Sequence, residues 1–593
     1  IIFGELNNNI MDLPTLNNEQ KRVVIVGAGF AGLNLAKSLS SKFFQVILLD
    51  KNNYHQFQPL LYQVATCGLE PSSISFPLRK IFQEKKNVFI RIAEVTSIEA
   101  DKQTVYTNIG EVKYDYLVLA YGATTNFFNH QQIQKNAFSM KSVSEALLLR
   151  NTLLQNYEKA LTAKTHEQKN ALLNVVIVGG GPTGVELAGA VAEMKLKILP
   201  KDYSEINFQQ MHIYLLEAAP NLLGGMSKDA GLTVEKYLDK LGVEVKLNTA
   251  VKDYDGENVL LNNDEIIKSN CLIWAAGVKG TALLGIPATS LATNERILVD
   301  EFNQVKGLKN IFALGDIALM QSPLFPKGHP QVAPVAIQQS KLLATNLKNI
   351  LLNKKIQSFT YNDKGSMATV GRNKAVAEVG KIKLKGFVAW FAWMMIHLMS
   401  IVGIKNRLFI LINWVWQYFT YDPSLRLIIK PTEMKYTNKL IKQVAFYILV
   451  TGFLVACNSN ENKKSELKIL SAVETKAQKS DEFANELTLN SGEKWNADAS
   501  TNLNVTALSK AIQSIHPTNL EAYHAAGKTL QEGIDKMIKE CKMKGPDHDA
   551  LHHWLEPLME KNKILQTAKS ANEATEAFDF IKNQVNQYEY FFK

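Results

Sequence analysis

The sequence is poor in cysteine. Its 593 residues include only four, at positions 67, 271, 457 and 541. Their wide separation excludes a disulfide-stapled scaffold. The absence of any Cys-x-x-Cys pair excludes a zinc ribbon and a thioredoxin-like redox site. An N-terminal secretory signal is not expected either, because residues 1–20 are polar and rich in asparagine; we expect them to be a disordered leader or a reading-frame artefact.

No composition bias points to a fibrous or disordered chain. Hydrophobic residues make up 46% of the sequence and charged residues 21%, which is ordinary for a globular protein. The length exceeds what one core can hold, and roughly 150 residues per domain suggests about four units. The formal net charge of +10 permits a phospholipid surface, a nucleotide or a nucleic acid as partner, but does not choose among them.

Between Lys21 and Ile317 the pattern is α/β. Short runs that are apolar on both faces alternate with helical stretches, as in parallel strands buried between helices. Two glycine-rich turns separated by about 150 residues predict two dinucleotide-binding, Rossmann-like domains, the second nested in the first. The expected strands are Val23–Val26, Val46–Leu49, Tyr116–Ala120, Val175–Val178, His212–Leu216, Cys271–Ala275 and Ile311–Ala313.

The first glycine turn contains Gly27, Gly29 and Gly32 and joins a strand to a helix. In such a turn the first glycine allows the bend, the second lets a pyrophosphate approach, and the third packs helix against strand. Asp50 follows Gly27 by 23 residues and ends the next strand, where a ribose ligand belongs. The alternative is a purely structural glycine turn.

The second turn repeats this logic with Gly179, Gly181 and Gly184. Glu217 ends the next strand 38 residues after Gly179, a gap lengthened by an extended helix and its connection. A carboxylate at this place accepts from a ribose 2′-hydroxyl and repels a 2′-phosphate, which favours NADH over NADPH.

Two nested sites suggest one bound FAD and one exchangeable pyridine nucleotide. The strand before Gly315 delivers Asp316 to a helix start, where its carboxylate could bond the ribityl chain or act only as a helix N-cap. Gly122 and Gly277 follow strands in small-residue segments that look like the crossovers between the two domains.

Glu186 has two compatible interpretations. Thr183-Gly-Val-Glu186 fits a capping box, which is a structural role. A carboxylate at the mouth of the second turn could instead face the nicotinamide and the flavin.

Four segments are more specific than these motifs: 55–65 (HQFQPLLYQVA), 179–189, 331–339 (QVAPVAIQQ) and the aromatic block 390–421. Through these segments the chain resembles the type II NADH dehydrogenases. The resemblance extends from about Lys21 to Pro431. These dehydrogenases are single-subunit NADH:quinone oxidoreductases that do not pump protons. The resemblance implies bound FAD, NADH as co-substrate, hydride transfer to the flavin and two electrons passed to a membrane quinone. It implies no metal and no nucleic acid, and it allows a homodimer.

The resemblance also assigns roles to residues. Gln338 matches the last glutamine of the family's A-Q-x-A-x-Q quinone-site pattern, while Pro334 stands where the first glutamine is often found, and Gln339 is a second candidate. With Glu186, these glutamines are the expected catalytic residues. An ordinary surface position is the alternative for Gln338. The expected FAD ligands are Gly27, Gly29, Phe30, Gly32, Asp50, Lys51, Gly122, Gly315 and Asp316, and the expected NADH ligands are Gly179, Gly181, Gly184, Glu217 and Gly277.

Cys67 tests a rival function. A soluble flavin-dependent NADH oxidase or peroxidase would use a flavin-facing cysteine downstream of its first glycine turn. In the family resembled here this position is usually small, so Cys67 is otherwise a compact core residue, and Cys271 is interpreted as core.

Residues 381–432 are expected to form membrane-association helices. They combine an apolar stretch (387–404), interfacial tryptophan and tyrosine, and five cations. The stretch is just long enough to span a bilayer; we prefer a pair of interfacial helices on the cytoplasmic face of a bacterial inner membrane, and a buried core hairpin is the alternative. The cations are Lys381, Lys383, Lys385, Lys405 and Arg407.

After residue 433 the character changes again. Residues 434–457 resemble a lipoprotein signal, with a basic start, a short apolar run and Leu-Val-Ala-Cys457. Residues 458–502 are linker-like and 503–593 form a helical domain. We interpret 434–593 as a second protein, a small lipoprotein, joined to the first; a lipid-anchored binding protein with an incidental FAD part is a third hypothesis. His548 and His552 share a helix face, as metal or haem ligands could, although solvated histidines are the plainer interpretation.

The sequence thus predicts a discontinuous FAD-binding domain (21–150 and 285–380) that contains an NADH-binding domain (171–284).

Overall fold

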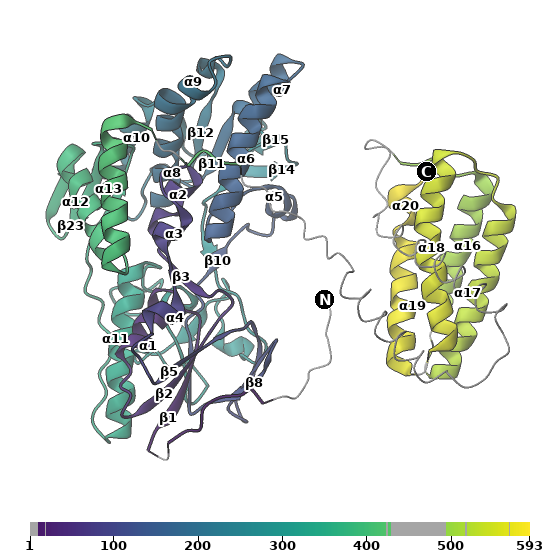
Figure 1. Ribbon diagram of the computed structural model, residues 1–593, viewed down its shortest axis with the longest axis horizontal. Helices are drawn as coiled ribbons and strands as arrows, with labels where there is room; N and C mark the ends of the chain where they lie inside the picture. The colour runs from purple at the N-terminus through teal and green to yellow at the C-terminus, as the bar shows by residue number, and fades with distance from the viewer. Residues whose placement is uncertain are drawn as a thin grey trace, which may run out of the picture. The chain divides into compact units, whose positions relative to one another are not determined.

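A computed structural model describes residues 10–428 and 494–593, apart from residues 18, 423, 424, 516, 518 and 569. The chain divides into two compact units, Ile1–Glu433 and Met434–Lys593. Each unit is described by itself (Figure 1). The predicted lipoprotein signal, 434–457, lies outside the described residues.

The first unit is built on a five-stranded parallel sheet in the order β20-β9-β1-β2-β5. Its central strands are apolar on both faces and buried, because helices 30–38 and 333–351 cover one face and the antiparallel strands at 95–113 cover the other. Helices α1 (Phe30–Ser38) and α11 (Ala333–Leu351) pack against each other beside it. The strands are β1 (Lys21–Val26), β2 (Phe44–Asp50), β5 (Val88–Ile92), β9 (Tyr116–Leu119) and β20 (Ile311–Ala313).

A second parallel sheet, β13-β12-β11-β17, comes entirely from the chain between β9 and β20. The prediction of an α/β fold with one nucleotide-binding domain nested in another is therefore confirmed. Two short strands, β10 (Thr124–Thr125) and β18 (Val278–Lys279), pair antiparallel where the chain enters and leaves the insertion. The sheet strands are β11 (Val175–Val178), β12 (Ile213–Leu216), β13 (Val243–Lys246) and β17 (Leu272–Trp274).

The long gap between the second glycine turn and its acidic residue has a structural cause. Helix α8 (Pro182–Glu193) continues through a π-helical turn (Met194–Ile198) into α9 (Leu199–Asp202) before β12 begins. Helix α6 (Val143–Leu161) lies between the two domains in sequence and begins with a capping box formed by Ser142 and Glu145.

The other helices and strands around the two sheets are short, except for the 12-residue α10. The helices are α2 (Leu61–Ala65), α3 (Pro71–Ile74), α4 (Leu78–Ile81), α5 (Gln131–Asn136), α7 (His166–Leu173) and α10 (Lys228–Asp239). The strands are β3 (Tyr54–Gln56), β4 (Ser75–Pro77), β6 (Val95–Glu99), β7 (Thr104–Thr107), β8 (Gly110–Lys113), β14 (Val251–Tyr254), β15 (Asn258–Leu261), β16 (Ile266–Lys268), β19 (Ile297–Val299) and β21 (Ala318–Met320).

The last part of the first unit is an antiparallel sheet followed by two helices. Strands β22 (Ser366–Thr369), β23 (Ala375–Val379) and β24 (Ile382–Lys385) lead into α12 (Gly386–Ser400) and α13 (Ile404–Thr420). Helix α12 packs on β23, and β22 packs on α8. Within the described residues, none of the helices is both long and apolar enough to cross a bilayer.

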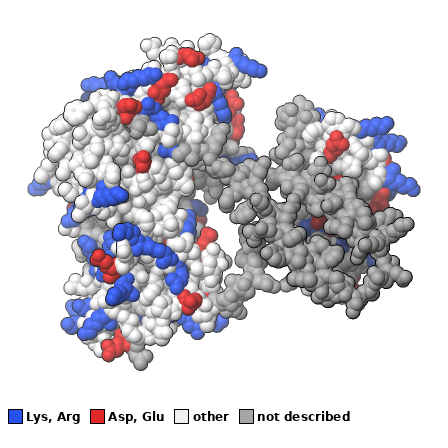
Figure 2. Space-filling model, in the orientation of Figure 1, with Lys and Arg blue, Asp and Glu red and all other residues white. Residues whose placement is uncertain are grey.

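The outer surface of α12 and α13 is apolar, which contradicts the alternative of a buried core hairpin. This face carries few charged residues (Figure 2). Its exposed large apolar side chains are Phe387, Val388, Phe391, Ile396, Met399, Ile404, Leu408, Phe409, Ile412, Val415, Trp416 and Phe419.

The expectation of a disordered leader is wrong for residues 10–17. The Met11 amide donates to the Glu111 carbonyl at 2.9 Å, and the Met11 side chain is only 6% exposed. The Pro14 carbonyl accepts from the Gln45 amide. The Met11 side chain belongs to the same apolar cluster as Val105 of β7 and Val112 of β8, which anchors this segment. Residues 1–9 lie outside the described residues.

In the described part of the second unit, residues 494–593, four long helices and one short one form a bundle. Trp554 is buried at its centre, and its indole donates to the Gln584 carbonyl. The predicted linker ends earlier than expected: Trp495 already pairs with the last residues of the chain, and the first helix begins at Ala499 rather than at residue 503. The helices are α16 (Ala499–Ser514), α17 (Leu520–Glu540), α18 (Pro546–Thr567), α19 (Ala571–Asn586) and α20 (Tyr588–Phe591).

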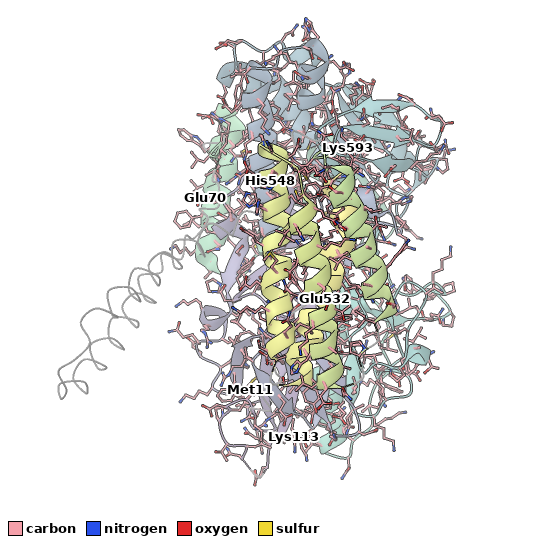
Figure 3. The ribbon with its side chains drawn as sticks, turned by 90° about the vertical axis from the view of Figure 1, so that its right-hand side faces the viewer. Met11, Glu70, Lys113, Glu532, His548 and Lys593 are labelled. Carbon is pink, nitrogen blue, oxygen red and sulfur yellow. The ribbon has the colours of Figure 1, made fainter. Side chains whose placement is uncertain are left out.

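Two of the three histidines of α18, His548 and His552, lie together on the surface of the bundle. The rings of His548 and His552 meet edge to face at 4.5 Å between centroids, near the start of α18 (Figure 3). Across the part of the chain that the structure describes, no group of three or more His, Cys, Asp or Glu residues is placed to hold a metal. The metal interpretation of this pair therefore gains no third ligand.

Candidate active site

The first glycine turn has the shape that a pyrophosphate requires. Gly27 has φ of +97°, and a side chain there would meet the Ala120 carbonyl at 2.6 Å. A side chain at Gly32 would overlap the Gly27 carbonyl, so helix and strand pack as closely as predicted. At Gly29 the nearest atom to an added Cβ is 4.0 Å away. The backbone at the start of α1 is thus open to an anion, which fits FAD.

Asp50 lies at this turn, as expected. Its carboxylate accepts from the Ala28 amide at 2.6 Å and from the Asn52 amide at 2.7 Å. Burial raises the pKa of Asp50. The aromatic ring of Phe30 is at the start of α1, while Lys51 is exposed to solvent.

Gly315 and Asp316 form a short 3-10 turn after β20 rather than the start of a long helix. The N-cap of this turn is Leu314, and α11 begins at Ala333, so the N-cap alternative for Asp316 is wrong. Burial raises the pKa of the Asp316 carboxyl, whereas the charges of Lys141 and Arg296 lower it. A carboxylate between two cations fits a role toward the polar chain of FAD. At Gly122, an added side chain would meet nothing within 4 Å.

The two neighbouring glutamines of α11 have separate surroundings. Both amide atoms of Gln338 bond the backbone of Asn362, at 2.9 and 3.0 Å. Gln339 is 1% exposed, and its carbonyl oxygen accepts from the Gly315 amide at 2.8 Å. Gln339 therefore contacts Gly315, one of the expected FAD ligands. Gln338 instead holds the chain segment at Asn362, before β22.

The second glycine turn matches the first. Gly179 has φ of +109°, with the Ala275 carbonyl 2.7 Å from an added Cβ, and a side chain at Gly184 would overlap the Gly179 carbonyl. Gly181 has open space beside it. Glu217 accepts from the Gly180 amide at 2.5 Å and from the Ala219 amide at 2.7 Å. These groups fit a second dinucleotide. Gly277, with φ of +84°, packs near the Phe128 ring.

Glu186 does not form the predicted capping box. Helix α8 begins after Gly181 without a side-chain cap, so Thr183 is already inside the helix. Oε1 of Glu186 instead accepts from the Trp393 indole at 3.1 Å and from the Thr369 amide at 3.5 Å. Burial outweighs these two bonds and raises the pKa of Glu186 to about 8.

A cavity opens beside Glu186, between α2, α8, α12 and α13. Its wall includes a second carboxyl on the same face of α8, Glu193, which accepts from the Arg372 amide at 2.7 Å. Burial raises the pKa of Glu193. The lining residues are Tyr62, Gln63, Thr66, Gly68, Glu186, Ala190, Glu193, Met194, Ile198, Thr369, Gly371, Arg372, Trp390, Trp393, Met394, Trp414, Gln417, Tyr418 and Tyr421. Neither Gln338 nor Gln339 is among them.

Most of these lining residues were not singled out from the sequence. The family-specific segment 55–65 contains Tyr62 and Gln63, and the segment 390–421 contains Trp393 and Trp414. The specificity of these two segments was the signal in the sequence that could have pointed to the cavity. Their convergence depends on long-range packing that no local motif expresses.

Aromatic rings connect the cavity to the first glycine turn. The Phe30 ring contacts that of Phe57, which contacts His397 at 6.2 Å between centroids. His397 stacks on Trp393 at 4.1 Å. Burial lowers the pKa of His397 to about 4, so this imidazole is neutral at physiological pH. The FAD segment and the Glu186 cavity therefore share one apolar wall.

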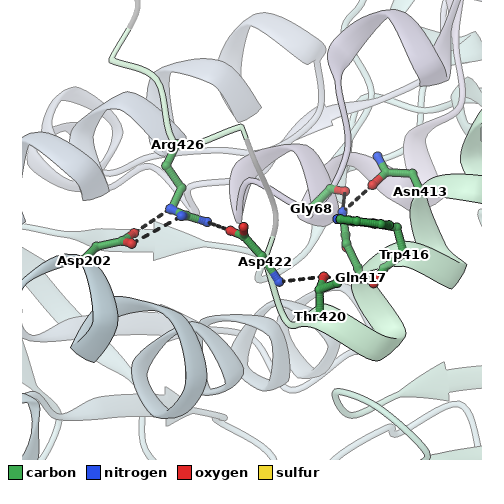
Figure 4. A network of polar contacts seen from close by, with 8 residues as sticks. All are labelled: Gly68, Asp202, Asn413, Trp416, Gln417, Thr420, Asp422 and Arg426. Atoms are coloured by element: carbon green, nitrogen blue, oxygen red, sulfur yellow. Dashed lines mark hydrogen bonds and ion pairs between the residues drawn. The ribbon is translucent and has the colours of Figure 1, made fainter.

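Two sets of polar contacts hold α13 and the segment that follows it in place (Figure 4). The Gln417 amide donates to the Gly68 carbonyl at 2.5 Å and to Asn413 at 2.8 Å. Arg426 pairs with Asp202 of α9 at 2.5 Å and with Asp422 at 2.9 Å. Near its end, α13 is thus bonded to the loop after α2, and the segment after α13 is bonded to α9.

The environment of Cys67 does not suit a nucleophile. The side chain is 1% exposed in the apolar core, and burial raises the pKa of its thiol to about 11. The thiolate required by a peroxidase would be scarce at neutral pH. Cys271 is buried as predicted, and its thiol pKa is raised to about 12.

Comparison with known proteins agrees with this architecture. The pyridine nucleotide-disulphide oxidoreductase family model matches residues 21–340, and the NDH2 C-terminal domain model matches residues 364–420. Type II NADH:quinone oxidoreductase NdhA of Mycobacterium tuberculosis is 36% identical over 420 residues, which cover 68% of this chain and 88% of that protein. The internal alternative NAD(P)H-ubiquinone oxidoreductase A1 of Arabidopsis thaliana mitochondria is 28% identical, over 68% of this chain and 85% of that protein.

A solved structure shares the fold. NDH2 from Plasmodium falciparum, in complex with NADH, superimposes with a TM-score of 0.64 at 24% identity and covers 69% of this chain and 100% of its own. Together with the nested nucleotide sites and the C-terminal helices, these matches establish that the chain belongs to the type II NADH:quinone oxidoreductases.

Proposed function

We propose that the chain catalyses its family's reaction, the oxidation of NADH by a quinone through FAD without proton pumping, and that quinone binds in the cavity beside Glu186. The observation that carries the assignment of this cavity is a buried, hydrogen-bonded carboxyl in an aromatic-lined space that shares a wall with the FAD segment.

The two glycine turns divide the nucleotides between them. Gly27, Gly29, Gly32, Asp50 and Asp316 would hold FAD, which supplies a two-electron carrier between NADH and the quinone. Gly179, Gly181, Gly184 and Glu217 would hold NADH. The Glu217 carboxylate accepts from backbone amides on both of its oxygens, which fixes it where a ribose hydroxyl can donate to it.

Glu186 provides a proton close to the site of quinone reduction. Reduction of a quinone to a quinol consumes two protons. Because the pKa of Glu186 is about 8, its carboxyl is mostly protonated at neutral pH. Oε1 accepts from Trp393 and Thr369, so the proton belongs on Oε2.

The apolar face of α12 and α13 supports docking on a lipid surface. Trp416 is 63% exposed and Phe419 is 77% exposed. Both are on α13, which also lines the cavity through Trp414. Such a face would bury its aromatic side chains at the boundary between headgroups and acyl chains and admit a quinone from the bilayer. We propose peripheral attachment on the cytoplasmic side.

Some of the predicted lipid-binding cations have internal partners. Lys385 pairs with Asp229, and the Arg407 guanidinium donates to the Ile401 carbonyl. Lys381 and Lys405 are exposed beside the apolar face. Electrostatic attraction to anionic lipid therefore supplements apolar insertion and does not replace it.

The helical bundle is proposed to be a separate lipoprotein. Its compactness and the division of the chain near residue 433 support this proposal. A native mass near 48 kDa for the first unit, at about 110 Da per residue, would agree with separate products. A single native polypeptide of 66.3 kDa would contradict it.

The full chain, loaded with FAD, provides the test of function. We expect NADH oxidation to require a quinone, and Cys67→Ala to leave turnover unchanged because the thiol is inert. Quinone-independent turnover that Cys67→Ala abolishes would instead support the oxidase or peroxidase.

A further inference from the structure

Tyr62 is held in the cavity wall with a defined direction for its hydroxyl proton. Helix α2 places it there, 6% exposed, next to Gln63. The Gln63 amide nitrogen lies 3.0 Å from the Tyr62 hydroxyl oxygen, and the Trp414 indole nitrogen lies 2.8 Å from the Gln63 carbonyl oxygen.

These contacts determine which group donates. An indole N–H can only donate, so the Gln63 atom that it meets must be the carbonyl oxygen. The other end of the side-chain amide is therefore NH₂, which can only donate to Tyr62. The Tyr62 oxygen is an acceptor in this contact, and its own O–H proton remains for another partner.

No acceptor for that proton lies within hydrogen-bond distance among residues 10–428 and 494–593 as far as they are described. Burial raises the pKa of Tyr62, and so do the two carboxyls of α8, Glu186 and Glu193. Oε1 of each carboxyl already accepts hydrogen bonds from other groups. Glu186 accepts from the Trp393 indole and the Thr369 amide, and Glu193 accepts from the Arg372 amide. The cavity therefore contains a buried, pre-oriented hydroxyl donor.

We propose that the Tyr62 hydroxyl donates a hydrogen bond to a carbonyl oxygen of the bound quinone, with Gln63 and Trp414 as the positioning residues that aim it. This inference rests on the proposed location of the quinone. A quinone head group offers carbonyl acceptors and no donor, so it complements this wall. A quinol must turn its own hydroxyl proton away from Tyr62, and the same donor thus favours the oxidised form over the product.

Tyr62→Phe removes the donor and keeps the ring. A neutral hydrogen bond contributes about 0.5–1.5 kcal/mol, so we expect the KM for a short-chain quinone to rise about two- to twelvefold. The rate of flavin reduction by NADH without a quinone should not change. The matched control is Tyr114→Phe, because Tyr114 is another buried hydroxyl without a partner among the described residues and does not line the cavity.

Gln63→Glu tests the direction of the bond while Tyr62 stays in place. An ionised carboxylate only accepts, so it would accept from the Trp414 indole and also capture the Tyr62 proton. We expect the KM for quinone to rise as in Tyr62→Phe, whereas a role of Tyr62 in packing alone predicts no such change. Quinone binding can be followed directly by quenching of indole fluorescence from the cavity tryptophans.

Ala190→Trp distinguishes the two levels of the proposal, because Ala190 lines the cavity and a large side chain there would fill it. If Ala190→Trp abolishes quinone binding but Tyr62→Phe and Gln63→Glu bind quinone like the wild type, the role of Tyr62 is wrong and the location of the quinone stands. If Ala190→Trp also binds quinone normally, the location itself is wrong.

Discussion

The indole nitrogen of Trp393 in α12 lies 3.1 Å from Oε1 of Glu186 in α8, a hydrogen bond between residues 207 positions apart. It connects the NADH-binding domain to the C-terminal helices at the wall of the cavity. Since the indole donates, it stabilises the ionised carboxylate and lowers the pKa of Glu186, while burial raises it. The pH dependence of quinone reduction should therefore report on this contact.

Quinone reduction should slow as the pH rises through about 8. The Glu186 carboxyl is protonated below this pKa and ionised above it, so the proton on Oε2 is available only on the acid side. Glu186→Gln should remove this alkaline limb and lower kcat with quinone about 10²-fold, as loss of a positioned acid does. Reduction of the flavin by NADH should be unaffected, and an unchanged pH profile in the variant would contradict the role.

Trp393→Phe should move the same limb to higher pH. The variant keeps an aromatic ring but removes the N–H that favours the carboxylate, so the pKa of Glu186 rises further. The measurement is the pH profile of kcat with quinone. A shift toward acid would mean that the indole bond acts in the opposite sense.

Glu217 should control the choice between NADH and NADPH. Glu217→Gln loses the negative charge that accepts from a ribose hydroxyl and repels a 2′-phosphate, so the KM for NADH should rise about tenfold and the discrimination against NADPH should fall. Steady-state kinetics with both nucleotides measure the change. Glu244→Gln, at an exposed glutamate on the neighbouring strand, is the control and should leave both values as they are.

Arg426 should stabilise the packing of the segment after α13 against α9. It is 23% exposed and pairs with Asp202, which is 27% exposed (Figure 4). Arg426→Ala should lower the free energy of unfolding of the first unit by about 1–2 kcal/mol, more than an exposed pair contributes. Lys21→Ala, which breaks the more exposed pair with Asp115, is the comparison and should cost less. Thermal or denaturant unfolding measures both losses. If the two variants lose the same free energy of unfolding, the Arg426 ion pair is no stronger than an exposed one.

Binding to lipid vesicles should depend on the outer aromatic residues of α13. Trp416→Ser and Phe419→Ser each remove a large exposed side chain from the apolar face, and each should weaken partition about tenfold. Leu324→Ser, at an 82% exposed leucine outside α12 and α13, should leave partition unchanged. Co-sedimentation with anionic vesicles provides the measurement, and equal loss in all three variants would contradict docking through α13.

The nucleotide-binding domains followed from local rules. Gly27 and Gly32, like Gly179 and Gly184, are required by the backbone itself, since any side chain there would collide with a neighbouring carbonyl. Two edge strands, β5 and β13, are only partly buried and were not predicted. The other seven strands of the parallel sheets are buried and apolar on both faces, so their positions could be predicted within one or two residues. Such features depend on short segments of chain.

The cavity could not be predicted in the same way. Glu186 fitted a capping box because Thr183 has the right spacing, but the helix begins at Pro182 after Gly181 and turns the carboxyl toward Trp393 instead. Gln63 and Trp414 meet only because α13 folds back over α2. Packing between distant segments decided these contacts, and a single sequence does not reveal them.

The most direct test of the central claim is a stopped-flow comparison of the two half-reactions in Ala190→Trp and the wild type. If quinone binds beside Glu186, NADH should reduce both proteins at the same rate, and quinone should reoxidise the variant at least about tenfold more slowly. Reoxidation of Ala190→Trp by quinone at the wild-type rate would contradict the account.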